Sequence, residues 1–104
     1  MSGANPKRGE ASFTVGGELV LLRPSFAALV AAEEELGPLF ALVERAAEGR
    51  LGLAEMASLL FHCAADLPDG VTRERIGQAI AERGLAKATP VLRTLLTQIL
   101  QGRV

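Results

Sequence analysis

The sequence predicts a mainly α-helical protein in which an N-terminal β-hairpin packs on a compact bundle of about five short helices. Three observations predict this fold. Two short apolar runs flank Gly16-Gly17, capping residues and glycines divide residues 25–102 into five segments, and these segments carry apolar residues at helical spacing. Because the connections are short, neighbouring helices should run antiparallel. We assign residues 10–102 to one domain, with the hairpin at 10–23 and the helical bundle at 25–102.

The hairpin is predicted from the dipeptide Gly16-Gly17, because a type I′ turn needs positive φ at both central positions. The flanking runs at 10–15 and 18–22 are short and rich in apolar residues. An isolated hairpin is only marginally stable in water, so this one should lie on the helices. The side chains expected to face the helices are Phe13, Val15, Leu19 and Leu21.

The first two helices are delimited by capping residues. Ser25 is a favourable N-cap for a helix that ends at Leu36, where Gly37 supplies the C-terminal glycine. Pro38 suits the first position of a second helix, because its missing N–H has no partner there in any case. This helix should end near Gly49.

The other three helices follow the same logic. A third helix from about residue 53 to 66 precedes the turn at 68–70, and its apolar residues cover slightly more than half of its circumference, which predicts a central position. Thr72 should cap a fourth helix that ends at Arg83. The fifth helix should begin at Thr89-Pro90 and end at Gly102.

The fifth helix is the first candidate for a contact surface. Its apolar residues span about half of the helix circumference, which is more than packing on one neighbour requires. The alternative is that the helix packs between two neighbours. The candidate partner-binding residues are Leu92, Leu95, Leu96, Ile99 and Leu100.

Composition favours a protein-binding role and excludes others. Hydrophobic residues make up 49% of the 104 residues, and with 11 glycines this set exceeds the usual share, which suggests apolar surface that a partner covers. A net charge of −1 and the absence of Trp and Tyr argue against nucleic acid. We expect no membrane span, no secretory signal, a disordered tail at residues 1–9 and a cytoplasmic location.

Candidate chemistry is weak. Ser58, His62 and Asp66 lie four residues apart on one predicted helix, but parallel side chains on one face do not converge as a catalytic triad must. We interpret them as a solvated face with a weak His62–Asp66 pair and expect no enzyme activity. One histidine and one cysteine, Cys63, give no metal-ligand cluster, and no P-loop pattern is present, so we expect no cofactor.

Glu33 is the one anomalous residue, because it falls inside the apolar stripe of the first helix, whereas Glu34 and Glu35 look like a solvated face. A carboxylate in that stripe needs a partner. The alternatives are Arg23, Arg45, Arg93 or the N-terminus of a neighbouring helix. A structural role is the main interpretation and a contact with a partner protein is the alternative.

Residues 22–37 resemble the opening of a known family, the small tail-cluster proteins of gene transfer agents and related prophages, classed with phage tail-assembly chaperones. In that family a short hairpin precedes a helix patterned Phe-x-x-Leu-x-x-x-Glu-x-x-Leu-Gly. The similarity extends over roughly residues 10–102 and departs at Phe61, where members often have Trp. The matching motif positions are Phe26, Leu29, Glu33, Leu36 and Gly37.

The resemblance implies a tail-assembly chaperone that binds the tape-measure protein in the bacterial host cytoplasm. Its apolar helix surface would cover apolar stripes of that client reversibly. The main alternative is a structural minor tail or tail-tube component retained in the particle. Other expectations left open are binding to another tail protein, a homo-oligomer, and a free-standing helical regulator.

Overall fold

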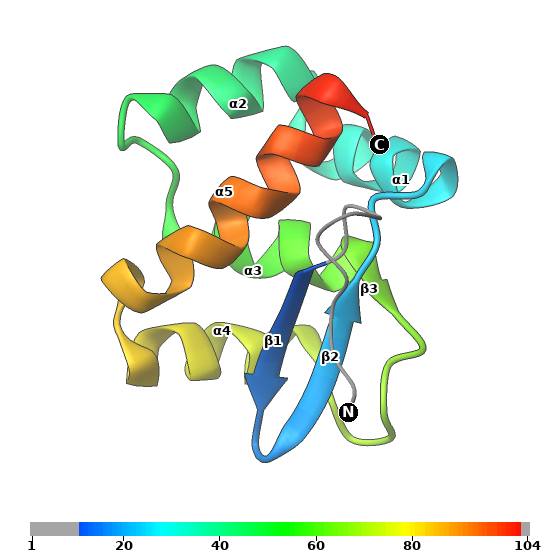
Figure 1. Ribbon diagram of the computed structural model, residues 1–104, viewed down its shortest axis with the longest axis vertical. Coiled ribbons are helices and arrows are strands. Elements are labelled where there is room, and N and C mark those ends of the chain that lie inside the picture. The colour runs from blue at the N-terminus through cyan, green and yellow to red at the C-terminus, as the bar shows by residue number, and fades with distance from the viewer. Residues whose placement is uncertain (1–10, 103–104) are drawn as a thin grey trace.

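The structure is a computed structural model that describes residues 11–102, so the predicted tail at 1–9 and the first hairpin residue lie outside the described residues. The fold class is confirmed: it is mainly helical, with an N-terminal hairpin and five helices within the described range (Figure 1). The elements are β1 (Ala11–Val15), β2 (Glu18–Leu22), α1 (Phe26–Leu36), α2 (Leu39–Ala47), α3 (Leu53–Cys63), β3 (Ala64–Ala65), α4 (Arg73–Arg83) and α5 (Leu85–Gln101).

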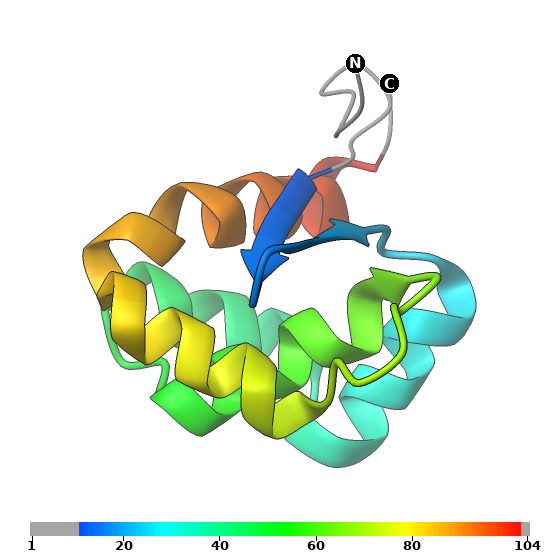
Figure 2. The same cartoon turned by 90° about the horizontal axis from the view of Figure 1, so that it is seen from below.

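The elements form two layers around the core. Figure 2 shows the hairpin beside α5, with both lying over α3 and α4. Helix α1 packs against α3, and α2 follows α1. Six residues of α3 are buried, so this helix is central. The broad apolar face of the helix predicted this position. One cluster of apolar side chains joins both layers.

The hairpin turn forms as predicted, but the buried face of β2 was predicted wrongly. Gly16 and Gly17 have φ of 54° and 84°, the positive values that a type I′ turn requires. The two-residue turn pairs Phe13 with Val20. Cross-strand partners share one face of a sheet, so Val20 and Leu22 are buried with Phe13 and Val15, whereas Leu19 remains 40% exposed and Leu21 is only half-buried.

Helix α3 ends at Cys63, three residues before the predicted end at Asp66. Ala64 and Ala65 instead form β3, which pairs antiparallel with β2 and makes a three-stranded sheet in the order β1-β2-β3. Alanine favours helix, so here a long-range backbone pairing overrides local propensity. Asp66 then takes a positive φ of 51°, which leads the chain out of the strand.

Two predicted N-caps are present. The Ser25 hydroxyl accepts a hydrogen bond from the Ala28 N–H at 3.2 Å, and the Thr72 hydroxyl accepts one from the Arg75 N–H at 3.2 Å. These bonds satisfy N–H groups that have no partner inside the helix. Pro38 occupies the N-cap of α2 instead of its first helical position, and α2 ends at Ala47, near the predicted Gly49.

Helix α5 begins at Leu85, directly after Gly84, and not at Pro90 as the sequence suggested. A proline inside a helix cannot donate to the carbonyl four residues earlier, which is that of Ala86. Pro90 is the sixth residue of α5, and the helix continues through it without this hydrogen bond. The Thr89 hydroxyl donates to the Leu85 carbonyl at 2.9 Å and adds a bond in this first part of the helix.

Candidate protein-interaction surface

A groove separates α2 from α5. It has a volume of about 490 Å³. Its lining is mostly apolar, with Met56 of α3 and Leu92 of α5 as buried members and Arg93, Thr89 and Thr97 as polar ones. The remaining lining comes from the end of α2, the loop that follows it and the outer face of α5: Val43, Ala46, Ala47, Gly49, Leu51, Leu85, Leu96 and Leu100. An apolar groove with a few polar groups suits a helical peptide.

A smaller hollow of about 180 Å³ continues this groove towards α1. It shares Val43 and Leu100 with the groove, and its other lining includes Glu33 and Phe40. Phe40 is 78% exposed, and Leu100 is 52% exposed. Large apolar side chains therefore stand open to solvent along this edge, where a partner protein would remove them from water.

The structure divides the five α5 candidates into inner and outer residues. Leu92 and Leu95 are 7% and 0% exposed and belong to the core, so they do not offer a free contact surface. Leu96 and Ile99 are half-buried against the core, and Leu100 is exposed. The expectation that α5 packs between two neighbours thus holds for its inner face. A contact role stays a prediction for Leu96, Ile99 and Leu100.

The family-motif residues of α1 have different environments. Phe26 is 85% exposed, whereas Leu29 and Leu36 are partly buried and pack against the core. Gly37 ends the helix with a φ of 92°, and its N–H donates to the Glu33 carbonyl. The side chain of Phe26, the aromatic residue of the motif, is therefore mostly exposed to solvent and is not part of the core.

Glu33 caps the next helix. Its Oε2 accepts a hydrogen bond from the Leu39 N–H at 3.1 Å, at the first residue of α2. This is the helix-start alternative among the partners considered from the sequence. Pro38, as N-cap, has no side-chain oxygen to offer, so the carboxylate of the preceding helix supplies the acceptor.

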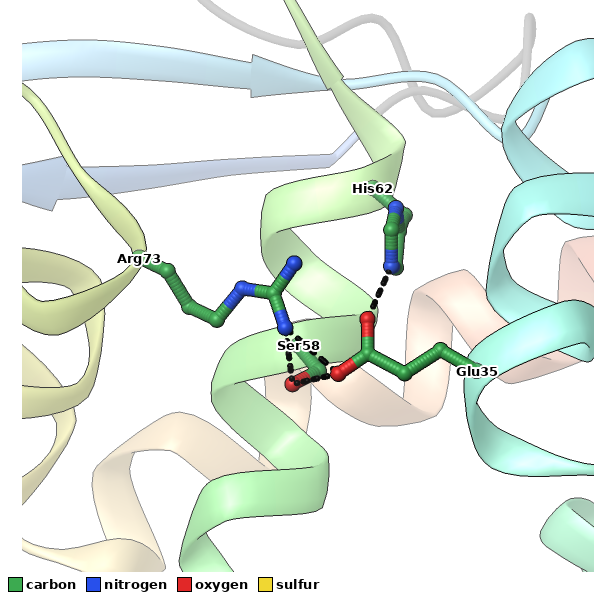
Figure 3. A network of polar contacts seen from close by, with 4 residues as sticks. All are labelled: Glu35, Ser58, His62 and Arg73. Atoms are coloured by element: carbon green, nitrogen blue, oxygen red, sulfur yellow. Dashed lines mark hydrogen bonds and ion pairs between the residues drawn. The ribbon is translucent and has the colours of Figure 1, made fainter.

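A polar network joins α1, α3 and α4 (Figure 3). Glu35 Oε1 lies 2.6 Å from Nε2 of His62, and Glu35 Oε2 accepts from an Arg73 N–H at 2.5 Å. The Ser58 hydroxyl donates to the same Glu35 oxygen at 3.2 Å and accepts from Arg73 at 3.2 Å. Each of these polar groups therefore has a partner on another helix.

This network corrects two expectations. Glu35 is exposed as expected, but its carboxylate also bonds to side chains of two other helices, and Ser58 is not solvated, since it is only 5% exposed. The predicted row of Ser58, His62 and Asp66 does not form on one helix, because Asp66 lies beyond the end of α3. His62 contacts Glu35 of α1, so the predicted weak pair with Asp66 is replaced by a contact between helices.

The electrostatics of the network favour a charged Glu35. The hydrogen bond from His62 and the nearby Arg73 guanidinium hold the pKa of the Glu35 carboxyl below its usual value of 4.5. The Arg73 guanidinium also lies over the Phe61 ring, 4.8 Å from its centroid. The network thus links helices α1, α3 and α4 beside the core.

No other chemical centre stands out in the part of the chain that the structure describes. Within residues 11–102 no three His, Cys, Asp or Glu side chains are grouped to hold a metal ion. Burial raises the pKa of the Cys63 thiol to about 12, so the thiolate form is disfavoured. No helix among the described residues has the length and apolar character to cross a membrane.

Sequence reasoning missed Glu35 and the α2 wall of the groove. Glu34 and Glu35 look alike in the sequence, and only the packing of α1 on α3 distinguishes them. A signal for the groove was present in the small residues Ala46, Ala47 and Gly49, which leave space opposite α5. Small residues at a helix end are common, so this signal alone carries little specificity.

Comparison with known proteins identifies a family. No curated protein and no solved structure matches the chain. A family profile described as "Phage tail tube protein, GTA-gp10" matches residues 8–102, which is nearly the whole chain. The matched span includes the hairpin, all five helices of the described range and the groove between α2 and α5. The chain therefore belongs to the phage tail tube protein family GTA-gp10.

Proposed function

We propose that this protein is a structural component of a phage-like tail, retained in the assembled particle and bound to neighbouring tail proteins. The observation that carries the proposal is the family match over residues 8–102, since the family is described by the tail tube. That description favours a structural tail component over the tail-assembly chaperone that the resemblance of residues 22–37 implies.

The α2–α5 groove is the surface that we assign to this role. Its lining is apolar, it is open, and the exposed Phe40 and Leu100 stand beside it. Burial of this apolar surface by a partner would favour association. The role needs no catalytic step: Ser58 and His62 hold Glu35 in place, and the protein acts by binding. Assembly would take place in the cytoplasm of the bacterial host.

A tail-assembly chaperone is the second candidate. It is favoured by the same groove, because an amphipathic helix of a long client such as the tape-measure protein would fit a mostly apolar groove. A chaperone would leave the client when the tube polymerises. The two candidates therefore differ in whether the protein is present in the finished particle.

Quantitative mass spectrometry of purified particles tests this difference. We expect the protein in a fixed ratio to the other tail proteins, and the same ratio after a salt wash that removes loosely bound protein. A head protein of the same particles provides the internal standard. Absence from particles, with accumulation in the lysate of assembling cells, would reject the structural role and support the chaperone.

A further inference from the structure

We propose that the exposed face of α1 in one copy of this protein docks into the α2–α5 groove of a second copy. Phe26 and Val30 would fill the apolar groove, and Glu34 would pair with Arg93 of the second copy. This inference deepens the proposed function, because it names a second copy of the chain as a partner of the groove, and it rests on that function only for its biological setting.

The first argument is the apolar stripe on α1. Phe26 is 85% exposed and Val30 is 37% exposed. Residues four apart lie on one face of a helix, so Phe26, Val30 and Glu34 form one continuous stripe. An exposed phenylalanine at the start of a helix has no packing function inside this copy, and its burial in a partner would remove a large apolar area from water.

The second argument is the charge of the two helices. Helix α1 contains three glutamates and no basic residue, whereas α5 contains Lys87 and Arg93 and no acidic residue. Two of the glutamates are engaged within the same copy, Glu33 by Leu39 and Glu35 by His62 and Arg73. Glu34 therefore remains as the glutamate of α1 that can pair with a basic residue of a second copy.

Arg93 is the matching cation. It lines the groove, and among the ion pairs within residues 11–102 none includes Arg93 or Glu34. A basic α5 beside an apolar groove therefore complements an acidic α1 that carries an apolar stripe. Such complementarity fixes orientation and raises the rate of encounter more than it raises affinity.

The two surfaces lie on different parts of the molecule. Phe26 and Val30 line neither the groove nor its smaller continuation, so a copy that donates its α1 still has its own groove free. Such a contact is heterologous, and its repetition produces a closed ring or an open helical stack.

The test begins with self-association of the purified protein by sedimentation velocity, over concentrations up to roughly 1 mM. We expect concentration-dependent oligomers of the wild type. Phe26→Ser, which alters the inserted side chain, and Leu100→Glu, which alters the groove, should each weaken association about tenfold or more. Leu19→Ser is the matched control, because Leu19 is also exposed but lies on β2, and it should associate like the wild type.

Mixing the two defective variants gives the sharpest outcome. The Leu100→Glu chain keeps an intact Phe26, and the Phe26→Ser chain keeps an intact groove. A 1:1 mixture should therefore form a dimer with one working contact and stop there. Circular dichroism of each variant checks that the helices are intact, and both substituted side chains are exposed, so the fold should persist.

A charge exchange tests the polar contact independently. Glu34→Arg and Arg93→Glu should each weaken association, and the double variant should recover most of the loss. Wild type that stays monomeric over the whole concentration range would overturn the proposal. A 1:1 mixture of the two variants that forms no dimer would also overturn it. So would a chain that remains monomeric while its groove binds another tail protein, with the same affinity in wild type and in Phe26→Ser.

Failure of this contact and failure of the proposed function are distinguishable. A protein found in particles at fixed stoichiometry but monomeric in solution would keep its tail role and lose this interface. A protein that associates through Phe26 and the groove but is absent from particles would keep the interface and lose the structural role.

Discussion

The Glu35 carboxylate of α1 lies 2.6 Å from Nε2 of His62 on α3, although 27 residues separate the two in sequence. Arg73 of α4 reaches the other oxygen of the same carboxylate. One side chain thus connects three helices beside the core (Figure 3). Its neighbour Glu34 has no ion pair within the described residues, which makes the two glutamates a natural comparison.

Glu35→Gln should lower the melting temperature at neutral pH, whereas Glu34→Gln should leave it nearly unchanged. The pKa of Glu35 is lower in the folded protein than its usual 4.5, so folding favours the charged form. That contribution is present above pH 4.5 and is lost as the pH falls through the lowered folded pKa. The gap between wild type and Glu35→Gln should therefore narrow on acidification. Thermal melts from pH 7 to pH 3 measure it, and a pH-independent gap would contradict the ionic account.

Glu33→Ala should destabilise the protein by about 1 kcal/mol, because the Leu39 N–H at the start of α2 loses its acceptor. Glu33→Gln retains an amide oxygen at the same position and should lose less. Urea unfolding of both variants, with Glu34→Ala as the control for helix propensity, measures the effect. A loss for Glu33→Ala no greater than that for Glu34→Ala would show that the hydrogen bond contributes nothing.

Leu95→Ala should cost about 2–5 kcal/mol, since a fully buried side chain leaves a cavity. Leu100→Ala on the same helix should cost under roughly 1 kcal/mol, because this side chain is half in solvent and lines the groove. Chemical denaturation measures both. A large loss for Leu100→Ala would show that its side chain supports the core, and the groove would then lose its value as a free surface.

Gly37→Ala should destabilise the protein by about 1–3 kcal/mol, although a Cβ at this position meets no other atom within 4 Å. The reason is backbone strain, since φ of 92° with ψ of −174° is a conformation that essentially only glycine adopts. Gly37→Asn should not rescue, because asparagine tolerates a different positive-φ region.

Gly77→Ala inside α4 is the control for the glycine experiment. Its Cβ would lie 3.5 Å from the Cβ of Ala57, an ordinary contact, and alanine is the better helix former, so stability should stay equal or rise by up to about 1 kcal/mol. Thermal unfolding of both variants checks the pair. If Gly37→Ala were as stable as wild type, the strain argument would be wrong.

Local signals predicted most of the fold. Ser25 and Thr72 cap helices as expected, and Gly16-Gly17 makes the predicted turn, because these preferences depend on a few neighbouring residues. Helix α3 was predicted too long, since the pairing of Ala64 and Ala65 with β2 is a long-range event that alanine propensity opposes. Periodicity also gave no means to select the Glu35 partners, which come from two other helices.

The candidate surface was predicted only in part. The apolar width of α5 drew attention to its outer residues, but burial of Leu92 and Leu95 depends on how α5 packs against α4 and β1. A helical wheel gives the apolar face and not the share of it that neighbours occupy. The exposure of Phe26 was also not predicted from the sequence, because a phenylalanine at the start of a helix is normally expected to pack against the core.

The pairing of β2 with β3 has a consequence for synthesis of the chain. The hairpin is synthesised before its third strand at residues 64–65 and before α5, which packs against β1. Because an isolated hairpin is barely stable in water, the apolar side chains of Phe13 and Val20 remain exposed until these later elements are made. The nascent chain therefore exposes apolar residues of the hairpin until α5 has been made, and slow elongation across residues 85–101 should lower the yield of native protein.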